Sequence, residues 1–192
     1  MRKLILLAAV IAFISFTAAA QDKKQDEGDA NSGMLYGPDY TFVVKAPKGW
    51  VLDNESARRQ GIDAVFYPVG SSWKNSAAVM YVGIGRKQGA KDSLEGVISR
   101  DIADFKKASP DLKVSDGEAL PLARGKERVV VKYFIAEQQR SHEAVAYIEE
   151  SKVVVMLVLS SKTKADFDSS LPALKELVAS YFFLTDSPTI QK

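Results

Sequence analysis

Residues 153–159 constrain the fold of this chain most, because they form a run of seven apolar residues (VVVMLVL). The run is too short to cross a bilayer, which takes roughly 20 residues as a helix. Its β-branched valines favour a strand. Side chains of a strand alternate between two faces, so a fully apolar strand is buried on both. We therefore predict a central strand whose sheet has helices above and below it.

The residues before this run indicate neighbouring strands. The odd positions of 129–135 are all apolar and the even ones are mixed, which is typical of a strand with one fully buried face. A polar break at 137–141 is followed by a short apolar strand at 144–148 and a tight polar turn at 149–152. The segments 129–135 and 144–148 therefore predict two consecutive strands that lead into the central one.

Similar patterns predict the remaining strands and a first helix. Further strands are expected at 40–46, 64–67, 78–84 and, with a break, 112–122. Asp92 is expected to be the N-cap of a helix, with Glu95 three residues later. Apolar residues then recur every three or four positions up to Ala108, which gives the helix one apolar stripe.

A last helix is predicted from about residue 164 to 183. Pro172 lies within it, so the helix either kinks there or restarts with Ser169 or Ser170 as its N-cap. The order of elements predicts an α+β fold. We expect an α/β/α sandwich with a central, mostly antiparallel sheet of about six to seven strands flanked by helices.

The N-terminus has the pattern of an export signal. Arg2 and Lys3 precede an uncharged apolar stretch, and three alanines end at residue 20. We expect signal peptidase to remove residues 1–20 and the protein to be periplasmic or secreted. The alternative is an uncleaved anchor, since residues 4–20 reach the lower limit of about 17 residues for a spanning helix.

Composition excludes several classes of function. The chain contains no cysteine, so it has neither disulfides nor thiol chemistry. Its formal charge of +2 falls to zero without residues 1–20, which contain two basic residues and no acidic ones. Nucleic acids and anionic membranes are bound through excess Lys and Arg, so neither is an expected partner. We expect no stable membrane insertion after cleavage.

The boundaries of the domain follow from composition. Residues 21–35 are predicted to be a disordered tether, because 21–33 (QDKKQDEGDANSG) contain almost no apolar residue. A single domain is expected over residues 36–184, followed by a C-terminal tail at 185–192. The mature length is sufficient for one domain with its own core.

Residues that carry catalysis or bind metals do not gather in the sequence. The only histidine, His142, is expected to be exposed at a turn between strands. The segment 70–74 (GSSWK) lacks the closing glycine of a nucleophile elbow, and the glycines near residue 85 do not match phosphate-loop spacing. We therefore predict a protein that is not an enzyme and has no cofactor or metal. A hydrolase centred on His142 remains an alternative.

Three exposed residues are the candidate contacts for a partner. Trp73 and Lys74 place an aromatic ring beside a cation in a loop, and Tyr36 borders the tether. The alternative for Trp73 is that it folds back and caps an open end of the core, since Trp is usually buried.

Residues 40–50 (YTFVVKAPKGW) resemble the strand, proline and Gly-Trp turn that open PsbP-like domains. The order of elements is similar as well, over about residues 36–184. This superfamily includes the extrinsic photosystem II protein PsbP, the Mog-type Ran-binding import factor and envelope proteins of the DcrB and LpqN kind. The resemblance implies an α/β/α sandwich with a non-enzymatic binding or assembly role. It implies no functional residues.

The sequence thus predicts an exported, non-catalytic binding or assembly domain that contacts another protein of the cell envelope. A second hypothesis is a carrier of a small apolar ligand, held between the sheet and one helix in a pocket lined by Met80, Phe105 and Phe134. The hydrolase is a third.

Overall fold

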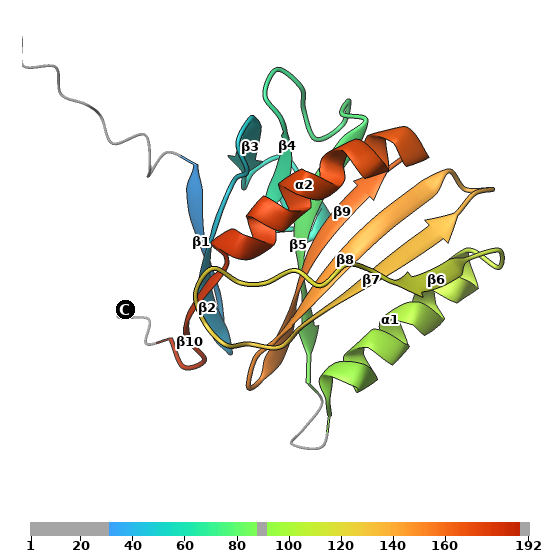
Figure 1. The fold of residues 1–192 in the computed structure, drawn as a ribbon. Coiled ribbons are helices and arrows are strands. Elements are labelled where there is room, and N and C mark those ends of the chain that lie inside the picture. Colours follow the sequence, from blue (N-terminus) through green and yellow to red (C-terminus); the bar gives the residue numbers. More distant parts are fainter. Residues whose placement is uncertain (1–30, 88–91, 189–192) are drawn as a thin grey trace, which may run out of the picture.

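The computed structural model describes residues 31–87 and 92–188, which form two sheets and two α-helices (Figure 1). The predicted signal peptide and residues 21–30 of the predicted tether lie outside the described residues. In chain order the elements are β1 (Ser32–Gly37), β2 (Tyr40–Lys45), β3 (Trp50–Asp53), η1 (Arg58–Gln60), β4 (Val65–Pro68), β5 (Ala78–Arg86), α1 (Leu94–Ala108), β6 (Lys113–Asp116), β7 (Val129–Ala136), β8 (Ser141–Glu149), β9 (Val153–Ser161), α2 (Lys164–Ser180) and β10 (Phe182–Thr185).

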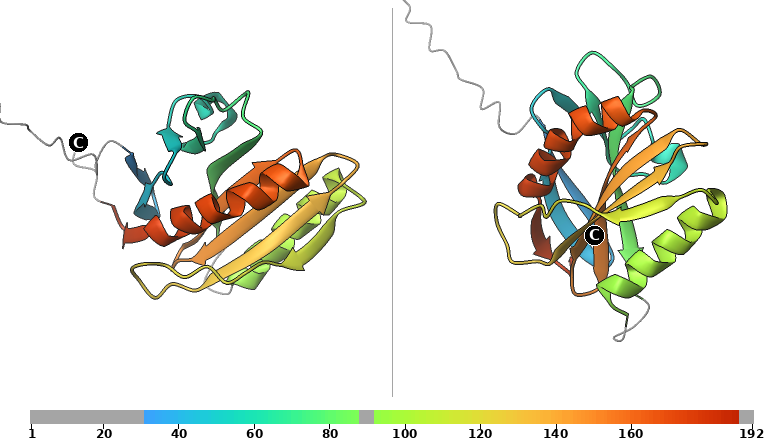
Figure 2. Two further views of the ribbon diagram at one scale, coloured as in Figure 1. Left: turned by 45° about the horizontal axis from the view of Figure 1, so that its top comes forward. Right: turned by 45° about the vertical axis from the view of Figure 1, so that its right-hand side comes forward.

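The larger sheet has seven strands in the order β3-β4-β5-β9-β8-β7-β6, and all neighbours are antiparallel. The predicted central strand, β9, is the fourth of the seven. The helix α1 covers one face of this sheet and α2 covers the other (Figure 2). The predicted α+β class and its α/β/α layers are therefore confirmed.

Alternate side chains of β9 supply two separate cores. Val155 and Leu157 pack on the α2 side, whereas Val154 and Val158 pack on the α1 side. On the α1 side, a Cβ added at Gly85 of β5 would lie 2.7 Å from the Val97 side chain of the helix. Glycine at this position therefore allows α1 to approach the sheet.

A second sheet of three strands, in the order β1-β2-β10, lies on the α2 side. Phe42 and Val44 of its middle strand are fully buried in the same core as α2. The backbone N–H of Lys45 donates to the Ser180 hydroxyl at 2.9 Å, which ties β2 to the end of α2. The smaller sheet is thereby fixed against the rest of the domain.

Two strands of the smaller sheet differ from the sequence predictions. Residues 32–35 of the predicted tether belong to β1, because pairing with β2 and burial of Leu35 stabilise a segment of low apolar content. The last helix ends at Ser180 instead of residue 183. Phe182 and Phe183 pair with β2 as part of β10, which buries Phe183 against the core.

The helix caps also need correction. The N-cap of α1 is Ser93, whose hydroxyl accepts the Gly96 N–H at 3.2 Å, whereas Asp92 forms an ion pair with Arg100 at 2.8 Å. The helix α2 starts after Thr163 and runs through Pro172 without a restart. Contacts with the sheet stabilise the helical segments before and after Pro172, so the helix continues through the proline.

Two strands are placed differently from the sequence predictions. Trp50, which was predicted to lie in a turn, is instead the first residue of β3, and this strand pairs with β4. The predicted broken strand at 112–122 forms a ladder only over β6, and the following residues cross the α2 side of the sheet (Figure 1). Backbone N–H of Ala123 donates to the carbonyl of Ala179 on α2 at 3.2 Å, which holds this crossing in place.

Candidate functional site

Large apolar side chains are exposed on the smaller sheet. Four of the five such side chains in the described part of the chain lie there: Met34, Tyr36, Phe182 and Leu184. Met34 and Tyr36 are 62% and 66% exposed. Apolar residues scattered singly over a surface are ordinary, but a group on one sheet marks a candidate interaction site.

The strand register places these side chains on one face. Met34 of β1 and Phe182 of β10 both lie opposite Val43 of β2, and Tyr36 lies opposite Thr41. Residues directly opposite each other in antiparallel strands point to the same face. Met34, Val43 and Phe182 therefore form a row across the sheet, and Leu184 adjoins it at a bulge.

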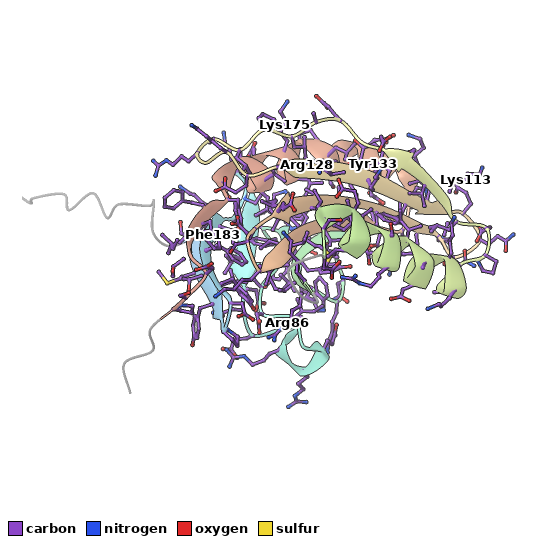
Figure 3. The ribbon with its side chains drawn as sticks, turned by 90° about the horizontal axis from the view of Figure 1, so that it is seen from below. Arg86, Lys113, Arg128, Tyr133, Lys175 and Phe183 are labelled. Carbon is purple, nitrogen blue, oxygen red and sulfur yellow. The ribbon has the colours of Figure 1, made fainter. Side chains whose placement is uncertain are left out.

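We call Met34, Tyr36, Val43, Phe182 and Leu184 the outer patch. Its sheet lies at one end of the molecule, marked in Figure 3 by Phe183, and β6, marked by Lys113, lies at the other. The helices α1 and α2 cover the larger sheet and leave the outer patch open.

The strand β1 also has a free edge beside the outer patch. Among the described residues, β1 pairs with β2 alone. The carbonyl of Asn31 accepts the Ala46 N–H at 2.8 Å, so residue 31 faces β2. Because backbone groups alternate along an antiparallel strand, the N–H and C=O of Met34 and Tyr36 point away from β2.

A groove of about 570 Å³ follows this free edge. One wall is β1, residues 32–36, and the opposite wall runs from Leu52 near the end of β3 to Ala64 just before β4. We call it the β1 groove. Leu52 and Ala64 give it apolar surface, and Asn54, Arg58 and Asp63 give it polar groups.

The second wall of the β1 groove is held by one carboxylate. Asp53 accepts hydrogen bonds from the Ser56 hydroxyl at 2.5 Å, from the Glu55 N–H at 2.8 Å and from the Tyr67 hydroxyl at 2.8 Å. Burial alone would raise its pKa, but these hydrogen bonds hold the pKa of Asp53 well below its usual range. Ionised Asp53 therefore braces the turn that carries Asn54 and Arg58.

The structure separates the residues predicted to contact a partner. Tyr36 lies in the outer patch. Trp73 is half-buried and meets the Tyr81 ring edge-on at 6.1 Å on the α1 side, with Lys74 exposed beside it. Tyr36 and Trp73 are thus on opposite sides of the larger sheet. The packing on Tyr81 agrees with the alternative that Trp73 covers the core.

His142 is not exposed, contrary to the sequence prediction. Its side chain is buried on the α2 side, 6.3 Å from the Phe167 ring, because β8 begins at Ser141 and carries His142 into the sheet. Neither ring nitrogen has a hydrogen bond among the described residues, and Nε2 lies 3.6 Å from a carboxylate oxygen of Glu137. The neighbouring Ser161 hydroxyl donates to the Thr163 carbonyl instead. The described part of the chain therefore contains no nucleophile paired with His142.

The pocket predicted for an apolar ligand does not form. Met80 is buried on the α2 side, whereas Phe105 and Phe134 stack at 4.6 Å on the α1 side. A different hollow, of about 350 Å³, lies between β7 and α2. Its lining includes Tyr133 of β7 and Pro172 of α2.

One buried carboxyl links the smaller sheet to the larger. Glu150, in the turn between β8 and β9, accepts the Tyr181 hydroxyl at 2.7 Å. Tyr181 immediately precedes β10 and is fully buried. Burial raises the pKa of Glu150 to about 7, although the Tyr181 hydroxyl lowers it in part. Within the described residues, no cluster of acidic or histidine side chains has the arrangement of a metal site.

Comparisons with known proteins find similarity to solved structures. No protein-family model matches the chain, and no curated protein matches its sequence. Among solved structures, the chain is similar to cyanobacterial PsbP (CyanoP) from Synechocystis sp. PCC 6803, determined in solution. The identity is 15%, the TM-score is 0.48, and the alignment covers 83% of this chain and 96% of that one. That protein is from the superfamily that residues 40–50 resemble.

The α+β fold class follows from the strand order and the two helices of the described residues. Both helices in the described part of the chain are too short or too polar to cross a membrane.

Proposed function

We propose that this chain is an exported, non-catalytic domain that binds another protein of the cell envelope through the outer patch. The observation that carries the proposal is the row of Met34, Val43 and Phe182 on the outer face of the smaller sheet. Met34 and Phe182 are exposed and Val43 is half-buried, while Phe42 and Val44 on the opposite face are buried in the core. Export rests on the signal pattern of residues 1–20.

The composition of the outer patch suits a protein contact. Aromatic residues and Met are enriched at the centres of interfaces, and the patch contains Tyr36, Phe182 and Met34. Tyr36 and Phe182 bury a large area at little cost in conformational entropy, because each has only two side-chain torsions. Lys45, at the end of the same face of β2, provides a polar rim.

The test is affinity capture from the envelope fraction of the source, with the full chain expressed there and mildly crosslinked. Met34→Thr combined with Phe182→Thr removes the row while keeping residues that favour strands. Val69→Thr is the matched control, because Val69 is 68% exposed but lies in the loop after β4. We expect a specific partner that is lost with the double variant and retained with the control. Equal capture by all three proteins would refute the proposal.

A second candidate function is the binding of a small apolar ligand in the hollow between β7 and α2. Its lining is largely apolar and includes Leu171 and Leu174. Pro172 has no N–H for the carbonyl of Asp168, which leaves an acceptor beside the hollow. Native mass spectrometry of the purified protein tests this function. A retained ligand that Leu171→Trp displaces would support ligand binding. A mass equal to that of the protein alone would contradict it.

A further inference from the structure

We propose that the β1 groove binds an extended segment of the partner as an additional β-strand on β1. This inference rests on the proposed function and specifies the form in which the partner binds. The partner would contribute a peptide with apolar side chains at alternate positions, one of which contacts the outer patch.

The backbone of β1 determines the extended form. The outward N–H and C=O groups of Met34 and Tyr36 recur every second residue, and only another strand matches this spacing. Strand addition at a free sheet edge is a common mode of peptide recognition, in which main-chain hydrogen bonds provide affinity and side-chain pockets provide specificity. Residues 33–37 of β1 span about 17 Å at roughly 3.4 Å per residue, so the bound segment would contain about five residues.

The second wall favours a single peptide over a second copy of this domain. If β1 paired with β1 of another copy, the β2 and β10 of that copy would extend from β1 toward the side where Asn54, Arg58 and Asp63 line the groove. A lone segment carries no further strand. It adds the width of a single strand, about 4.8 Å, to the edge of β1.

The side chains of the groove define the peptide more closely. Its residues alternate between the side of Met34 and Tyr36, which is apolar, and the side of Leu52, where the wall also carries polar groups. The charged groups of the groove are Arg58 and Asp63. Charge complementarity therefore favours a peptide that has one acidic and one basic residue next to its apolar ones.

The probe is a capped heptapeptide, Lys-Val-Thr-Val-Thr-Val-Glu, added to the full chain. Amide hydrogen exchange is followed at Met34 and Tyr36 with and without the peptide. A bound strand accepts hydrogen bonds from both amides, so we expect their exchange to slow by about tenfold or more at saturation. A version with N-methylated valines is the control, since it cannot complete the ladder.

A second arm separates this inference from the proposed function. Asn54→Trp fills the groove from its exposed wall without changing the outer patch, and its melting temperature is compared with that of the wild type. We expect Asn54→Trp to abolish both protection by the heptapeptide and capture of the partner. Capture that is lost with Met34→Thr and Phe182→Thr but retained with Asn54→Trp would overturn strand addition and leave the proposed function intact. Unchanged amide exchange at millimolar heptapeptide would also overturn strand addition.

Discussion

Replacement of Glu150 by Gln is expected to stabilise the protein above neutral pH. Burial raises the pKa of Glu150 from 4.5 to about 7, so the native state holds a proton that the unfolded chain releases between these values. A carboxyl whose pKa is raised by folding makes the native state less stable as the pH rises from about 4.5 to about 7. Above that range the full penalty remains.

The size of the effect follows from the same shift. One pKa unit corresponds to about 1.4 kcal/mol, so the complete shift gives an upper bound of about 3 kcal/mol. Solvent near the turn screens part of it, and we expect a gain of about 1–2 kcal/mol for Glu150→Gln at high pH. The amide oxygen still accepts the Tyr181 hydroxyl, so the variant keeps the hydrogen bond that the carboxyl makes.

Urea unfolding at about pH 4, 6 and 8 measures this difference. Glu150→Gln should match the wild type at the lowest pH and exceed it at the highest. Glu149→Gln is the control, because Glu149 lies beside it but is paired with Lys87 at 3.0 Å and is less buried. A Glu150→Gln protein that is less stable than the wild type at the highest pH would refute the assignment of Glu150 as a buried carboxyl with a raised pKa.

Three further substitutions test the packing. Trp73→Ala should lower the free energy of unfolding by about 1–3 kcal/mol, because Trp73 covers Tyr81. An unchanged melting temperature would contradict this packing and favour Trp73 as a partner contact. His142→Leu should raise the free energy of unfolding by about 1 kcal/mol, since neither buried ring nitrogen has a hydrogen bond and Nε2 is 3.6 Å from the carboxylate of exposed Glu137. A loss of stability in urea would show that the Glu137 contact stabilises the native state. Gly85→Val should lower the free energy of unfolding by about 1–3 kcal/mol, because the new side chain would clash with Val97. Calorimetry that shows no loss of stability would contradict the close approach of α1 to the sheet.

The larger sheet was predictable because its signals are local. The run at 153–159 is apolar on both faces, and such a strand belongs at the centre of a covered sheet. The alternation at 129–135 and the stripe of α1 likewise lie within single segments. Tertiary packing reinforces these preferences instead of opposing them.

The smaller sheet was not predictable in the same way. Its strands β1 and β10 come from opposite ends of the domain and are joined only by β2. The residues of β1 (SGMLYG) include two glycines, which weaken a strand signal, and those of β10 (FFLT) extend the apolar stripe of α2 in the sequence. Long-range pairing with β2 determines that both segments form strands.

The candidate site was missed for the same reason. Tyr36 was identified as a candidate contact, but Met34 and Phe182 join it only through the register of β2. An aromatic residue next to a cation directed attention to Trp73, which the structure places against Tyr81. No sequence pattern distinguishes an aromatic ring that faces solvent from one that folds back over its own sheet.

The outer patch can be tested most directly by hydroxyl-radical footprinting in the intact envelope of the source. Met34 is 62% exposed in the isolated protein and is readily oxidised when it is accessible. If a partner covers the outer patch, oxidation of Met34 should fall severalfold in the envelope relative to the purified protein, while oxidation of Trp73 stays the same. Equal oxidation of Met34 in both samples would contradict the proposal that this face binds another protein.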